Sequence, residues 1–136
     1  MKFHNRQFGE LTYDETHVFR FPEGIIGFEH LRKFLVVDEE DAEPFRWLVS
    51  LEDSDLSFPL IHPMVVVPEY TVPCASGATI FVVAVLTEPV EESTVNLRAP
   101  IIIDHTKRMG RQVIHDNDGY ALQHRLFPEF SPTRSR

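Results

Sequence analysis

The sequence predicts an all-β protein, a small closed or partly open antiparallel β-barrel with one or two short helical turns. Several segments alternate apolar and polar residues with the period of two that is typical of strands. Ten prolines and six glycines separate the apolar runs, and no stretch sustains the periodicity of a long helix. Short strands joined by frequent turns favour a barrel or a sandwich, and closure of a barrel also hides the strand edges.

The individual strands follow from this pattern. Phe45–Leu51 has an apolar residue at every odd position, which indicates a half-buried strand. His17–Phe21 places its two phenylalanines on one face in the same way. Thr79–Leu86 is a continuous run rich in Val and Ile, which predicts a strand buried on both faces. Further strands are expected at Lys33–Val37, Met64–Val67, Pro100–Asp104 and Arg111–His115.

Two segments combine turn residues with large hydrophobic side chains. They are Phe21–Phe28 and Leu56–Pro63. Such segments either close the ends of a barrel or, where they are exposed, form apolar patches that contact other proteins. Short helical turns are expected at Glu29–Phe34 and at Asp104–Met109.

The length of 136 residues fits one domain, which we assign to residues 1–127. Residues 128–136 lack periodicity and are expected to be a disordered tail. Cys74 is the one cysteine, which suits a reducing compartment. The longest apolar run, Ile80–Leu86, falls far short of the roughly 20 residues that a membrane helix needs. We expect a cytoplasmic protein that is a monomer when free.

The charge is acidic and unevenly placed. The formal net charge is −8, with −7 in residues 1–60, −3 in residues 61–100 and +2 in residues 101–136. A negative field repels a phosphate backbone, so direct binding of nucleic acid is disfavoured, and it attracts a basic protein surface. An RNA-binding barrel would instead need a basic stripe lined with aromatic side chains.

The residue patterns of catalysis and metal binding do not stand out. The seven histidines lack the close spacing of a metal site, and no cofactor motif occurs. Cys74 has no basic neighbour to activate it. A small hydrolase built from Asp53, Asp55 and His62 is the enzymatic alternative, but Glu-Asp-Ser-Asp is also ordinary turn chemistry. We therefore expect no enzymatic activity, no metal, no cofactor and no small-molecule substrate.

The two segments that combine turn residues with large hydrophobic side chains, together with several other stretches, resemble the FliW family of flagellar assembly factors. The similarity follows the family's order over most of residues 3–127. The stretches that carry it are Phe21–Glu29, Pro44–Asp53, Leu56–Pro63, Thr94–Ile101, Gly110–Ile114 and Tyr120–Phe127. Each stretch alone is weak evidence for the family, but their occurrence together in this order is specific to it.

The resemblance implies a β-barrel-like protein without catalytic activity that binds two protein partners. One is newly made flagellin, and the other is the translational regulator CsrA, a small basic RNA-binding dimer. Freed of exported flagellin, the protein would sequester CsrA and relieve repression of flagellin translation. This chain departs from the family between Tyr70 and Ile80, where many members carry a longer acidic segment, so contacts of that segment do not carry over.

Motif position and the apolar turns together suggest a set of partner-binding residues. They are Ile25, Phe28, Asp53, Phe58, Ile61, Asn96 and Arg98. Asn96 is also explained as a turn former, since asparagine at a strand end commonly caps a turn. The alternative to the FliW role is a β-barrel binding module with an unrelated partner.

Overall fold

The computed structural model describes residues 1–39, 41, 43–71, 77–115 and 119–126. Cys74 and the tail 128–136 lie outside these residues. Over these residues the chain forms mostly short strands, together with the 3-10 turns η1 (Glu15–His17), η3 (Pro63–Val65) and η4 (Val90–Glu92). The strands are β1 (Lys2–Asn5), β2 (Gly9–Thr12), β3 (Phe19–Arg20), β4 (Lys33–Asp38), β5 (Arg46–Ser50), β6 (Ser57–Ile61), β7 (Ala78–Val85), β8 (Thr94–Val95), β9 (Ile101–Asp104), β10 (Met109–Gln112) and β11 (His124–Arg125).

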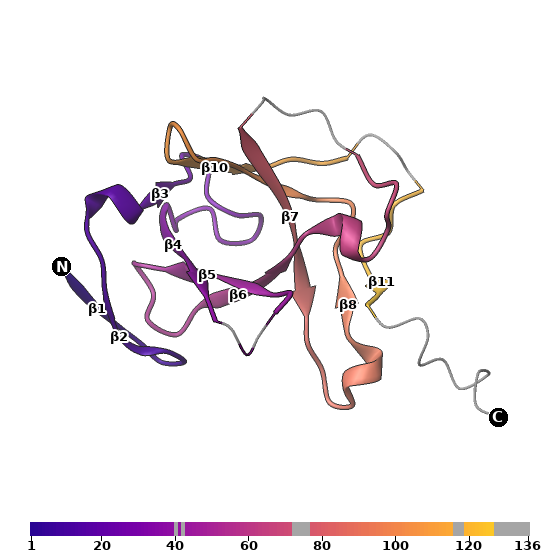
Figure 1. Cartoon of the computed structure of the whole chain (residues 1–136), viewed down its shortest axis with the longest axis horizontal. Helices are drawn as coiled ribbons and strands as arrows, with labels where there is room; N and C mark the ends of the chain where they lie inside the picture. The colour runs from indigo at the N-terminus through magenta and orange to yellow at the C-terminus, as the bar shows by residue number, and fades with distance from the viewer. Residues whose placement is uncertain (40, 42, 72–76, 116–118, 127–136) are drawn as a thin grey trace.

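Most of these strands close into a barrel. The order β7-β6-β5-β4-β3-β10-β9 returns to β7 through a second pairing of β7 with β9. The pairs are antiparallel except for the short parallel contact between β3 and β10. β1 and β2 form a hairpin on one side of the barrel, and β8 and β11 extend the sheet on the other (Figure 1). The predicted barrel class is confirmed.

β7 is buried on both faces, as its continuous apolar run predicts. Phe81 faces the barrel interior, where it packs in one cluster with Phe34 and Leu48. Val82 faces the opposite way and belongs to a second cluster with Tyr70 and other residues outside the barrel. The strand therefore separates two cores, which explains why it lacks the polar alternation of its neighbours.

The N-terminal hairpin covers the outside of β4 and β5. Its turn residue Phe8 packs edge-on against Trp47, with ring centroids 5.7 Å apart. Leu35 and Val49 are cross-strand partners on this outer face and are both buried. The Arg6 amide also donates to the Ser54 carbonyl at 2.8 Å. Four-residue strands give a weak sequence signal, and the hairpin was not predicted.

Two expectations about strands were wrong. Met64–Val67 does not form a strand, because Pro63 begins the 3-10 turn η3 and His62 Nδ1 accepts a hydrogen bond from the Met64 amide at 3.2 Å. Leu56–Pro63 was expected to be a turn, but most of it is β6. Pro59 is tolerated there opposite Trp47 because β6 pairs with β7 only from Leu60 onward, so Pro59 lies where β6 has a single neighbouring strand.

The remaining differences are a shifted strand and two expected helical turns that do not form, since Glu29–Phe34 is a loop that leads into β4. Strand β10 begins before the predicted Arg111–His115 and ends at Gln112. Asp104–Met109 makes the β9–β10 turn instead of a helical turn, and Asp104 Oδ1 accepts from the Thr106 and Lys107 amides at 3.0 Å each. This Asx geometry competes with helix formation.

Tyr70 anchors the second core and gives a testable pH dependence. Its hydroxyl donates to the Leu97 carbonyl at 2.6 Å. Burial, helped by the nearby Tyr120, raises the pKa of Tyr70 from 10.0 to about 12. Above pH 10 the unfolded chain ionises before the folded one, so this contribution to stability is present below pH 10 and is lost as the pH rises towards 12.

We expect Tyr70→Phe to lower the free energy of unfolding by about 1 kcal/mol at neutral pH, because Leu97 loses its hydrogen-bond donor. The difference in free energy of unfolding between the wild-type protein and Tyr70→Phe should narrow as the pH rises above 10, because phenylalanine does not ionise. Urea denaturation at a series of pH values measures both effects. A gap that stays constant through this range would contradict the raised pKa.

Candidate functional site

Three connections meet at one end of the barrel. Residues 21–32 join β3 to β4, residues 51–56 join β5 to β6, and residues 96–100 join β8 to β9. Neighbouring antiparallel strands place these connections at the same end. We call this set of three connections the loop end. It contains five of the seven residues that the sequence suggested for partner binding, and a sixth, Phe58, lies next to it at the start of β6.

The connection 21–32 is a tight turn around two isoleucines. Ile25 and Phe28 form an isolated antiparallel bridge, in which the Phe28 amide donates to the Ile25 carbonyl at 2.6 Å. Gly24 and Gly27 have φ values of +70° and +88°, which glycine adopts without strain. The turn buries Ile25, which is 4% exposed, and leaves its neighbour Ile26 55% exposed.

Phe28 and Phe58 form an aromatic pair beneath this turn. Their ring centroids are 5.3 Å apart with an interplanar angle of 68°, the edge-on arrangement that aromatic pairs prefer. Both side chains are half-buried and pack against the barrel core. One comes from a loop and the other from β6, so the pair fixes the loop to the barrel while part of each ring stays accessible.

Asp53 lies in a turn that hydrogen bonds stabilise. The buried Ser50 hydroxyl accepts from the amides of Glu52 and Asp53, and Asp53 Oδ1 accepts from the Asp55 amide at 3.0 Å. The Glu52 carboxylate in turn accepts from the Arg32 amide at 2.6 Å. These bonds tie the second connection to the first and leave the Asp53 side chain half-exposed.

Gln112 links the first connection to the third. Its Oε1 accepts from the Ile26 amide at 2.8 Å, and its Nε2 donates to the Ala99 carbonyl at 2.9 Å. Asn96 Oδ1 accepts from the amides of Arg98 and Ala99 at 3.0 and 3.1 Å. Asn96 is thus a turn-capping residue, and it sets the backbone from which the half-buried Arg98 side chain extends.

The predicted contact residues differ in how deeply they are buried. Phe28, Asp53, Phe58, Asn96 and Arg98 are half-buried at the loop end. Ile25 is a core residue there, and Ile61 is 2% exposed in the second core, at the far end of β6. The two isoleucines support the fold and present almost no surface to a partner. Ile26 is the exposed apolar residue that sequence reasoning missed, although it adjoins Ile25.

The loop end is also acidic. Glu23, Glu29, Asp53 and Asp55 lie on its connections, with exposed or half-exposed side chains. Hydrogen bonding from the Gly27 amide lowers the pKa of the Glu29 carboxyl, which keeps it ionised at neutral pH. Exposed or half-buried Ile26, Phe28 and Phe58 therefore lie among negative charges, a combination that suits a basic protein surface with apolar side chains.

The hydrolase arrangement is not assembled. Asp53 and Asp55 precede β6 and His62 follows it, so a strand of five residues, about 16 Å long, separates them. His62 Nδ1 is occupied in capping η3. Within the described ranges, no cluster of three or more His, Cys, Asp or Glu side chains is arranged to hold a metal ion. No helix in the described part of the chain is long and apolar enough to cross a membrane.

Fold and site together define a small β-barrel protein with an acidic and apolar surface built from loops. Comparison with known proteins is consistent with that class. The family model for the FliW protein matches residues 2–126. The chain therefore belongs to the FliW family.

Similar proteins cover nearly the whole chain. The flagellar assembly factor FliW of Thermosipho africanus is 42% identical over 96% of this chain and 98% of its own length. That of Caldanaerobacter subterraneus subsp. tengcongensis is 40% identical over 95% of each chain. A crystal structure of the flagellar assembly factor FliW superposes with a TM-score of 0.87 at 32% identity, covering 96% of this chain and 99% of that one.

Proposed function

We propose that this protein is a non-enzymatic flagellar assembly factor that binds flagellin and the translational regulator CsrA. Flagellin occupies it as newly made subunits accumulate. After flagellin export, the free protein binds CsrA and relieves repression of flagellin translation. Two findings support the proposal: relatives of nearly full length are named flagellar assembly factors, and the loop end is acidic and apolar.

The proposed contacts with CsrA lie at the loop end. Ile26, Phe28 and Phe58 supply apolar surface, and Asp53 and Arg98 supply charge. Ile25 and Asn96 contribute by holding these side chains in place, through the Ile25–Phe28 bridge and the Asn96 cap. Ile61 lies away from this surface, so we propose no direct contact for it.

Titration calorimetry with CsrA and with flagellin from the same host tests the proposal. We expect a complex with each at micromolar concentration, and the proposal fails if neither forms. Opposite charges steer association. Raising the salt concentration to ~0.5 M should therefore lower the rate constant for CsrA association at least about threefold. Salt-independent association would assign the binding energy to apolar contact alone.

A matched pair of variants localises the CsrA surface. Asp53→Ser removes one charge but keeps an oxygen able to accept from the Asp55 amide. Asp14→Ser makes the same change at the cap of η1, where Asp14 accepts from the Thr16 amide. We expect Asp53→Ser to weaken CsrA binding about threefold or more and Asp14→Ser to leave it unchanged. Equal effects of the two variants would contradict a CsrA site at the loop end.

A further inference from the structure

A side wall of the barrel carries positive charge although the protein as a whole is acidic. Lys33, Arg20 and Met109 are successive cross-strand partners on β4, β3 and β10. Their sequence neighbours Phe34, Phe19 and Gly110 are buried, so this row faces outward. Lys107 and Arg111 continue the exposed positive charge along the β9–β10 hairpin. We call Arg20, Lys33, Lys107 and Arg111 the cationic wall.

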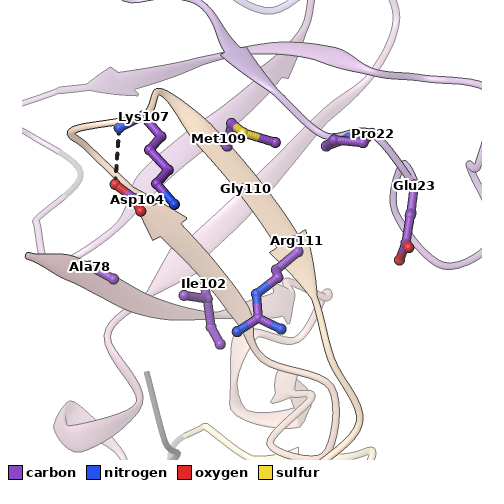
Figure 2. Close-up of a pocket in the computed structure, with 9 residues that line it drawn as sticks. All are labelled: Pro22, Glu23, Ala78, Ile102, Asp104, Lys107, Met109, Gly110 and Arg111. Carbon is purple, nitrogen blue, oxygen red and sulfur yellow. Dashed lines mark hydrogen bonds between the residues drawn. The ribbon is translucent and has the colours of Figure 1, made fainter. Parts of the chain in front are cut away.

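A cavity of about 350 Å³ opens on this wall. Ile102 lies opposite Arg111 in the β9–β10 register, and Met109, 39% exposed, is on the same hairpin. Figure 2 shows the long side chains of Lys107 and Arg111 extending on the side of the hairpin where Ile102 lies, with Pro22 and Glu23 across the hairpin from Ile102. The cavity thus combines aliphatic walls with two cations.

The two cations are available to a partner. In the described part of the chain, no carboxylate lies within ion-pair distance of Lys107, Arg111 or Lys33. Arg20 pairs with Glu15 at 3.2 Å. Two acids also line the cavity: Glu23 on its far rim, and Asp104, whose Oδ1 already accepts from the Thr106 and Lys107 amides.

We propose that the cationic wall is a docking surface for an extended acidic segment of a partner protein, in which acidic and apolar residues alternate. Carboxylates of the segment pair with Lys107 and Arg111, and its apolar side chains rest on the exposed Met109 and Pro22 beside the cavity. A cavity of 350 Å³ is at the small end of the ~300–1,000 Å³ range of ligand pockets, so it takes one or two side chains. This surface does not depend on the proposed function.

The wall favours protein over nucleic acid. Its charge attracts either, but single-stranded nucleic acid binds mainly by stacking bases on aromatic rings. The cavity lining in the described chain holds Pro22, Ala78, Ile102 and Met109 and no aromatic ring. The strong acidity of the rest of the protein also repels a long phosphate chain, while a short acidic segment meets the wall alone.

Amide chemical shifts of the ¹⁵N-labelled full chain test this proposal. The probe is a short synthetic peptide that alternates glutamate and leucine, compared with one that alternates lysine and leucine and with inorganic phosphate. We expect the glutamate peptide to shift the amides of Ile102, Met109 and Arg111. The proposal is overturned if these amides do not move, if the lysine peptide moves them equally, or if phosphate alone reproduces the shifts.

Charge-reversal variants provide a second test of the docking surface. Lys107→Glu/Arg111→Glu should weaken binding of the glutamate peptide about tenfold or more. Lys2→Glu/Arg6→Glu makes the same change in net charge on the β1–β2 hairpin and should weaken it less than about twofold. If the first variant does not fold, Lys107→Gln/Arg111→Gln replaces it. Equal weakening by the wall and hairpin variants would show a general charge effect and overturn the assignment.

Discussion

Replacing Gly24 by alanine is expected to lower the free energy of unfolding by about 3 kcal/mol. An added Cβ would lie 2.6 Å from both the Cα and the carbonyl oxygen of Glu29. These are backbone atoms, so no side-chain rotation relieves the overlap. The residue also has φ +70°, where any Cβ is strained. The turn that positions Phe28 must therefore shift or open, and urea denaturation measures the loss.

Gly27 supplies the matched control for this change. It lies in the same turn with φ +88°, but an added Cβ there meets nothing within 4 Å. Gly27→Ala should therefore lower the free energy of unfolding only by the cost of placing alanine at a positive φ, about 1–2 kcal/mol. The difference between the two variants isolates the overlap with Glu29. Equal losses would mean that the turn adapts to the extra atom, contrary to the packing in the structure.

The strands that the sequence predicted correctly are those whose pattern depends on burial alone. β5 alternates because its odd positions, among them Trp47 and Val49, form the apolar outer face that the N-terminal hairpin covers. β7 lacks alternation because a core lies on each side of it. In both cases the side-chain pattern shows that the strand is buried, but not which segment covers it: the outer face of β5 lies under the distant β1–β2 hairpin.

Predictions failed where a distant or unusual partner decides the structure. Apolar periodicity within Met64–Val67 does not show that Pro63 and the His62 cap begin a 3-10 turn. The prolines around β6 suggested a loop, yet pairing with Trp47 of β5 holds Pro59 in a strand, and the next residue, Leu60, pairs with β7 as well. The first outcome depends on the residues just before the segment. The second depends on which segments meet across the barrel, and one segment's sequence does not contain that information.

The candidate site shows the same division. The apolar turn 21–28 was found by composition, but in the pair Ile25–Ile26 sequence alone does not say which residue is buried. The Gln112 side chain decides which of the two is buried. It accepts a hydrogen bond from the Ile26 amide and so fixes the turn from 86 residues away. Asn96 was open to two interpretations, and its hydrogen bonds to the Arg98 and Ala99 amides support the structural one.

Gly110→Ala is expected to cost about 3–4 kcal/mol of stability, for a reason different from that at Gly24. An added Cβ would lie 2.3 Å from Cζ of the Phe21 ring. That ring is fully buried and packs against Phe34 with centroids 5.0 Å apart, so it has no free space to enter. Chemical denaturation of the variant measures the cost of this overpacking.

A double-mutant cycle identifies the cause. Phe21→Leu shortens the opposing side chain and alone should cost about 1–2 kcal/mol. Because leucine leaves room for the new methyl group, the double variant Phe21→Leu/Gly110→Ala should lose at least about 1 kcal/mol less than the sum of the single losses. Additive losses would mean that the methyl group overlaps something other than Phe21. A favourable coupling would establish that Gly110 is required so that this ring, at the start of the loop end, can pack directly on the β10 backbone.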